Sequence, residues 1–79
     1  MGQLKKLWER IKNNPKTVRF DELSKILKHK GYNERQPNGG SSHYTYRKYG
    51  EYPITIPKAS PYIKEEYVKQ VIDAVGENL

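Results

Sequence analysis

Apolar residues recur at helical spacing near both ends of the chain and alternate with polar residues in its middle. Near the N-terminus an i, i+3, i+4, i+7 stripe predicts a helix over residues 4–13. Asn14 and Pro15 are expected to end this helix, because the residue before proline avoids the helical region and proline has no amide donor. The stripe consists of Leu4, Leu7, Trp8 and Ile11.

A second helix is expected over residues 21–30. Its acidic first turn suits the positive end of the helix dipole, and Gly31 suits the left-handed residue that closes a helix. A last helix is predicted over residues 63–75, with Ser60 as a candidate cap and Gly76 as its end. The apolar stripes of these helices are Phe20, Leu23, Ile26 and Leu27, then Ile63, Tyr67, Val68, Val71, Ile72 and Val75.

Between these helices the pattern changes to short strands separated by turns. Strands are predicted over residues 32–36, 42–48 and 54–56, with turns at 37–40 and 49–52. Consecutive strands joined by tight turns favour an antiparallel meander. The order α-α-β-β-β-α therefore predicts an α+β fold, a three-stranded antiparallel sheet with helices packed on one face.

The chain length fits one domain. Its 79 residues leave no room for a second core, so we expect a single domain over 1–79. Within it an extra N-terminal helix is expected over about 3–13 and a core over about 17–77.

Alternation assigns the strand side chains to two faces. Tyr44 and Tyr46 share one face of the middle strand, and His43, Thr45 and Arg47 share the other. Because the apolar set must pack against the helices, the polar set is expected on an open face toward water.

Composition narrows the range of partners. Fifteen Lys and Arg against nine Asp and Glu give a net charge of +6, which favours nucleic acid, an anionic membrane surface or an acidic protein. The absence of Cys excludes disulfides, thiolate zinc sites and thiol catalysis. No apolar run is long enough for a membrane span or a signal peptide, so a cytoplasmic protein is expected.

The turn before the middle strand carries candidate phosphate-binding groups. Gly40 allows close approach of a backbone, and the amides and hydroxyls of Ser41 and Ser42 can donate to a phosphate. His43 follows directly, and histidine is the side chain best suited to proton transfer near neutral pH. We therefore take His43 as the candidate catalytic residue.

Cationic side chains flank the same region and could hold a phosphate and offset charge on a pentacoordinate transition state. With Thr45 of the open face, the candidate RNA-binding residues outside the turn are Arg35, Thr45, Arg47, Lys48 and Lys58. Two histidines fourteen positions apart with no carboxylate cluster nearby do not support a metal site.

Each of these candidate functional residues also has a purely structural interpretation. A strand histidine is often merely solvated, and Ser41 and Ser42 could serve the turn alone. His29, at a helix end among lysines, fits a surface residue that compensates the helix dipole. Trp8 is expected to anchor the first helix to the body of the protein.

The run GGSSHYTYRK, followed by ITIP and a terminal amphipathic helix, resembles the HicA family of toxin–antitoxin ribonucleases. The preceding NNPKTVRFDELSKILKHKGY is similar to the front of longer HicA-type chains, so the resemblance spans about residues 12–75. It implies a fold like that of double-stranded-RNA-binding domains. It also implies a metal-independent endoribonuclease (mRNA interferase) without cofactors, with His43 as the catalytic residue.

The resemblance also implies a partner, an antitoxin of the HicB type that covers the active face of a monomeric toxin. This chain has Gly-Ser-Ser-His with one histidine, where Gly-Ser-His or Gly-Ser-His-His is the commoner form. Lys58 stands after Pro57, where a histidine is frequent in the family, which leaves the second acid–base group unassigned.

Two other functions stay open at this point. A non-catalytic RNA-binding module would use the same sheet and basic surface without cutting RNA. A basic peripheral membrane protein is disfavoured, because the apolar stripes of the helices are needed for the core.

Overall fold

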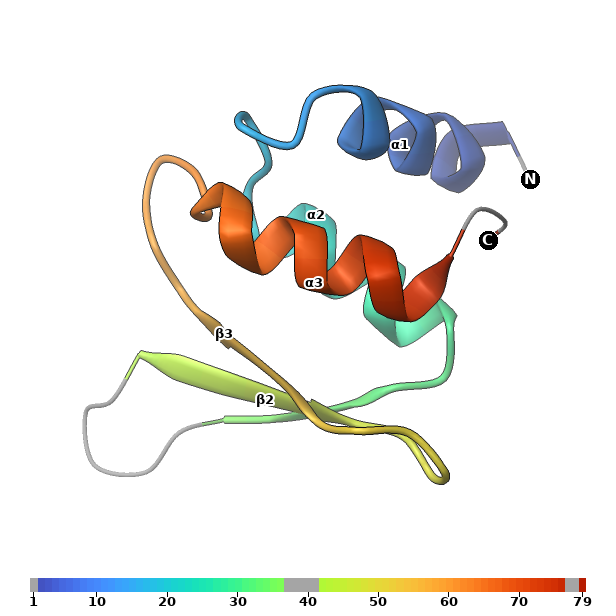
Figure 1. Cartoon of the computed structure of the whole chain (residues 1–79), viewed down its shortest axis with the longest axis vertical. Coiled ribbons are helices and arrows are strands. Elements are labelled where there is room, and N and C mark those ends of the chain that lie inside the picture. Colours follow the sequence, from blue (N-terminus) through green and yellow to red (C-terminus); the bar gives the residue numbers. More distant parts are fainter. Residues whose placement is uncertain (1, 37–41, 77–78) are drawn as a thin grey trace.

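Three helices and one three-stranded sheet make up the part of the chain that the structure, a computed structural model, describes: residues 2–36, 42–76 and 79. The element order is the predicted α-α-β-β-β-α, and all three helices lie on one side of the sheet (Figure 1). The predicted α+β class is thereby confirmed. The elements are α1 (Gly2–Asn13), α2 (Phe20–His29), β1 (Asn33–Arg35), β2 (His43–Arg47), β3 (Ile54–Pro57) and α3 (Glu65–Val75).

Element ends differ from the prediction by one or two residues. The largest correction is at α3, which begins at Glu65 with Lys64 as its N-cap residue, so Ser60 is not the cap. The segment before it is held elsewhere, because the amide of Ile63 donates to the carbonyl of Val18 at 2.8 Å. Ile63 is fully buried there, and it belongs to the core without being helical.

The predicted ends of the first and last helices are confirmed, and the second helix ends one residue earlier than predicted. Helix α1 ends at Asn13, and the chain leaves α2 through Gly31, whose φ of +96° is a conformation that glycine adopts without a steric penalty. Helix α3 gives way to Gly76, which also has a positive φ. None of the helices in the described ranges is long and apolar enough to cross a membrane.

The sheet is the predicted antiparallel meander, with β2 between β1 and β3. Thr45 marks the register, since it lies opposite Arg35 of β1 and Thr55 of β3. One residue further along β2, Tyr46 lies opposite Glu34 and Ile54.

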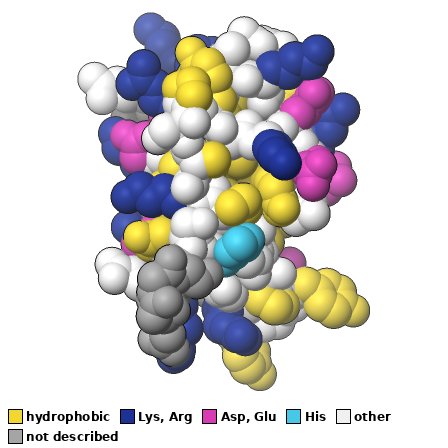
Figure 2. All heavy atoms as spheres, turned by 90° about the vertical axis from the view of Figure 1, so that its left-hand side faces the viewer, with side chains coloured by type: hydrophobic (Ala, Val, Ile, Leu, Met, Phe, Trp, Pro, Cys, Tyr) yellow, Lys and Arg dark blue, Asp and Glu magenta, His cyan; other side chains and the backbone are white. Residues whose placement is uncertain are grey.

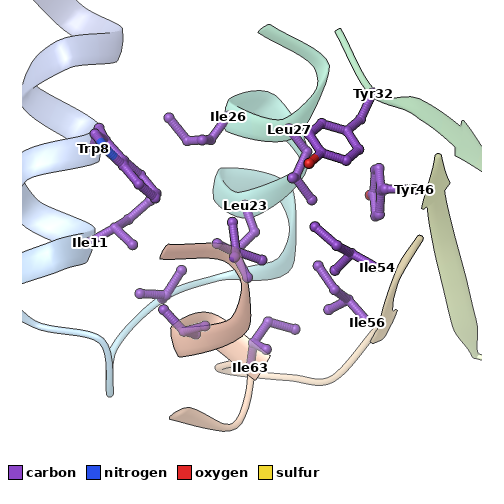
Figure 3. Packing of buried hydrophobic residues seen from close by; sticks show 13 residues of the cluster. Trp8, Ile11, Leu23, Ile26, Leu27, Tyr32, Tyr46, Ile54, Ile56 and Ile63 are labelled. Atoms are coloured by element: carbon purple, nitrogen blue, oxygen red, sulfur yellow. The ribbon is translucent and has the colours of Figure 1, made fainter. Parts of the chain in front are cut away.

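The hydrophobic core lies between the helices and the inner face of the sheet (Figure 3). Tyr46 and Ile56 come from the strands and are fully buried. Their helical counterparts include Leu23 and Leu27 of α2, and Val68 and Val71 of α3. The division of the strand side chains into an inner apolar and an outer polar set is as predicted.

Helix α1 is fastened to the rest of the domain by Trp8, as expected. Its ring is buried, and its indole Nε1 donates to the carbonyl of Gly76 at 3.2 Å. Residues 68 positions apart are thus joined, and the start of α1 lies next to the end of α3. The N-terminal helix therefore belongs to the same core.

Candidate nucleic-acid interface

The outer face of the sheet carries a group of polar and cationic side chains. In an antiparallel sheet, directly paired residues project to the same face. Because Arg35, Thr45 and Thr55 form one cross-strand row, and His43 and Arg47 are in phase with Thr45, all five share this face. We call these five residues the open face.

The open face is accessible. His43, Arg35, Arg47 and Thr55 are exposed, and Thr45 is half-buried. The helices all pack on the opposite side of the sheet (Figure 1), so no helix in the described part of the chain covers these side chains. His43 is therefore not sealed within the core, and its ring is accessible to a ligand on this face.

Strand geometry fixes the spacing of the open face. A rise of about 3.3 Å per residue separates the Cα atoms of His43 and Thr45 by about 7 Å, and those of His43 and Arg47 by about 13 Å. The hydroxyl oxygens of Thr45 and Thr55 lie 3.4 Å apart, which joins the middle of the face across β2 and β3. These hydroxyls could contact the sugar or phosphate of a bound strand.

His43 stands at the beginning of β2, opposite Pro57. The ladder continues one step beyond it, because the amide of Lys58 donates to the carbonyl of Ser42 at 2.7 Å. The backbone that carries the imidazole is therefore held on both sides of His43. Such support is what a group that must meet a substrate atom in a defined geometry requires.

Lys58 does not join His43 on the open face. Its Nζ lies 5.7 Å from the ring centroid of Phe20 and 5.9 Å from that of Tyr44, on the side of the sheet that the helices cover. The two rings pack against each other with centroids 4.9 Å apart. Ser42, paired with Lys58 through the backbone, is likewise out of phase with His43, and it is exposed.

A cavity of about 530 Å³ opens beside Lys58, between α2 and the segment that leads from β3 to α3. Four of its ten lining residues are cationic and one is acidic; the lining comprises Arg19, Phe20, Asp21, Ser24, Lys25, Lys28, Lys58, Ala59, Ser60 and Pro61. The candidate cations are thus divided between the open face and this separate basic hollow.

The remaining candidates lie elsewhere. Lys48 turns toward the inner side of the hairpin, with Nζ 5.6 Å from the ring centroid of Tyr32. Gly40 and Ser41, and the turn predicted over 37–40, lie outside the described residues, so their part in phosphate binding stays a prediction.

Sequence reasoning missed Glu34, the centre of a polar network on the inner face. Its Oε2 accepts hydrogen bonds from the Tyr46 hydroxyl at 2.6 Å and from the Ser24 hydroxyl at 3.1 Å, and Lys28 Nζ lies 3.4 Å from its Oε1. The Tyr46 hydrogen bond is the main cause of a lowered Glu34 pKa, and burial of the carboxylate acts against it. Alternation along β1 separates Glu34 from Arg35 by face, but only the pairing of Glu34 with Tyr46 across the sheet shows that Glu34 is on the inner face.

Charge is distributed unevenly over the surface. In the view of Figure 2, Lys and Arg side chains occur from the helical end to the sheet end, whereas most visible acidic side chains lie at the helical end. Within the described ranges, no three His, Cys, Asp or Glu side chains come together as metal ligands would. The chain has a formal charge of +6, and two of the five residues of the open face are arginines, a balance that favours anionic over cationic partners.

Comparisons of the chain with protein-family models, with curated proteins and with solved structures find no match. Function is therefore inferred from the residues themselves and from the resemblance of their order to that of the HicA family.

Proposed function

We propose that this chain is an endoribonuclease of the HicA type, with His43 as its acid–base group and the open face as its RNA-binding surface. One observation carries the proposal: an exposed histidine shares with Arg35, Arg47 and Thr45 a sheet face that none of the described helices covers. The arginines supply the charge that holds a phosphate backbone, and the histidine supplies a group that transfers protons near neutral pH.

The reaction needs only RNA and this chain. The ribose 2′-oxygen attacks the adjacent phosphorus, the bond from phosphorus to the 5′-oxygen breaks, and the 2′ proton is lost while the 5′-oxygen gains one. The products are a 2′,3′-cyclic phosphate and a 5′-hydroxyl. His43 either accepts the first proton or donates the second, and acid–base assistance of this kind contributes about 10²–10⁴-fold to a rate.

A regulatory partner is part of the proposal. An antitoxin of the HicB type would cover the open face, and an acidic surface on it would be attracted to a chain of charge +6. Covering Arg35 and Arg47 would block the substrate backbone as well as His43.

A non-catalytic RNA-binding module is the second candidate. One observation favours it: of the five residues of the open face, His43 is the one histidine, and the other four are two arginines and two threonines. In the nuclease, water or the substrate would have to supply the other proton step.

Product analysis separates the two candidates. RNA incubated with the protein in EDTA should give fragments that end in 2′,3′-cyclic phosphate and begin with a 5′-hydroxyl. If the protein binds the RNA but does not cut it, the nuclease is excluded and the RNA-binding module is supported. RNA that is neither bound nor cut would exclude both.

A further inference from the structure

The tip of the hairpin between β2 and β3 exposes two aromatic rings that the core does not use. Tyr49 is 103% exposed and Tyr52 is 92% exposed, whereas Tyr32 and Tyr46 are buried. Figure 2 shows hydrophobic side chains projecting from the sheet end of the molecule. A pair of fully exposed rings at one tip gives the fold no packing energy and is typical of a binding surface.

The tip has a defined backbone. The amide of Glu51 donates to the carbonyl of Lys48 at 3.0 Å, which closes a β-turn with Tyr49 at its second position. Gly50, at the third position, has a φ of +82°, which glycine accepts without strain. The turn fixes the backbone that carries Tyr49, and Tyr52 follows the turn directly, so holding a ligand costs little further backbone freedom at Tyr49.

Charge complementarity identifies the ligand. Arg47 is exposed on the open face two residues before Tyr49, and the chain carries a charge of +6. Surfaces for single-stranded nucleic acid combine cations that follow the backbone with aromatic side chains on which bases stack. The tip supplies the aromatic part, and the open face supplies the cationic part.

The tip and the open face lie within reach of one RNA strand. Three Cα–Cα steps of 3.8 Å keep the Cα atoms of Tyr49 and Tyr52 within about 11 Å of each other. Strand β2 ends at Arg47, about 13 Å from His43 at a rise of about 3.3 Å per residue, and two further Cα–Cα steps keep Tyr49 within about 21 Å of His43. An RNA strand whose scissile phosphate lies at His43 therefore reaches the tip only if it extends several nucleotides beyond that phosphate.

We infer that Tyr49 and Tyr52 form a base-stacking platform for single-stranded RNA, which binds the substrate away from the bond that is cut. The inference rests on the proposed function and deepens it. The platform selects unpaired RNA, because stacked and paired bases of a duplex do not present their faces to a side chain.

The test compares binding of an uncleavable 2′-O-methyl RNA strand with binding of an abasic strand of equal length. Tyr49→Ala and Tyr52→Ala should each weaken binding of the base-containing strand by about fivefold to a hundredfold, and binding of the abasic strand by less than twofold. Tyr49→Phe should keep the affinity, because the ring does the stacking. Tyr62→Ala, at a tyrosine that is 42% exposed outside the hairpin, is the matched control.

Each outcome decides the inference. Equal weakening with both strands, or no weakening with either, would overturn stacking, and continued cutting of RNA would leave the proposed function intact. Failure of the wild-type protein to bind either strand would overturn the inference and the proposed function together. Weakened binding of an antitoxin alone, with RNA affinity unchanged, would assign the tip to a protein partner and contradict the inference.

Discussion

The hydroxyl of Tyr46 donates a hydrogen bond of 2.6 Å to the carboxylate of Glu34, directly across β1 and β2 on the face that the helices cover. Tyr46 is fully buried, and the side chain of Glu34 is 19% exposed. The contact joins the inner face of the sheet to α2, because Ser24 donates to the same carboxylate oxygen. It holds β1 in register with β2, and thereby holds Arg35 beside Thr45 on the opposite face.

Tyr46→Phe is expected to lower the free energy of unfolding by about 1.5–3 kcal/mol, because it removes a hydrogen bond to a charged acceptor. Urea unfolding followed by circular dichroism measures the change. Tyr52→Phe removes a hydroxyl that is already in water and should change stability by less than about 0.5 kcal/mol. Equal effects of the two substitutions would show that the buried hydrogen bond contributes nothing.

The same pair predicts how stability depends on pH. The Tyr46 hydrogen bond is the main cause that lowers the Glu34 pKa below its usual value of 4.5. The stability that the Glu34 carboxylate contributes is therefore complete above pH 4.5 and is lost as pH falls through the folded-state pKa. Burial, followed by the bond to Glu34, raises the pKa of Tyr46 above its usual 10, so this contribution is lost only as pH rises through the higher folded-state value.

Unfolding free energies measured across the acid range should therefore show a wild-type advantage over Glu34→Gln that shrinks at low pH. At high pH, one part of the phenolate absorbance should appear together with unfolding. Tyr46→Phe should reduce this part without removing it, because burial also raises the pKa of Tyr32. An advantage over Glu34→Gln that stays constant through the acid range would contradict the assigned role of the Glu34 carboxylate.

The sequence predicted the element order, the inner and outer strand faces and the anchoring role of Trp8, because each depends on local periodicity. It did not reveal Glu34, because a charged residue becomes recognisable as an inner-face residue only when its partner across the sheet is known. It grouped Lys58 with His43, although Lys58 follows Pro57 by one residue and so turns to the other face. Two residues that are close in sequence, or that carry the same charge, need not project from the same face of a sheet.

Lys58 and the open-face arginines should therefore respond differently to substitution. Arg35→Ala and Arg47→Ala should each weaken RNA binding and reduce the slope of log affinity against log salt by about 0.7, with stability nearly unchanged. Lys58→Ala should instead cost about 0.5–1 kcal/mol of stability, because its ammonium lies over the rings of Phe20 and Tyr44. Salt titrations of binding and thermal unfolding of the same three variants provide the comparison.

A loss of salt dependence in Lys58→Ala as large as in Arg47→Ala would place the RNA backbone over the basic hollow beside α2. An unchanged salt slope in both arginine variants would exclude the open face as the surface that holds the backbone.

The central claim is that one imidazole on the open face carries the chemistry. Its most direct test is the single-turnover rate of RNA cleavage in EDTA by the wild-type protein, by His43→Ala and by the matched control His29→Ala, which changes an exposed histidine at the end of α2. The account predicts a loss of about 10²–10⁴-fold in His43→Ala, with His29→Ala within about twofold of wild type. Equal rates in His43→Ala and wild type, with both proteins folded, would contradict it.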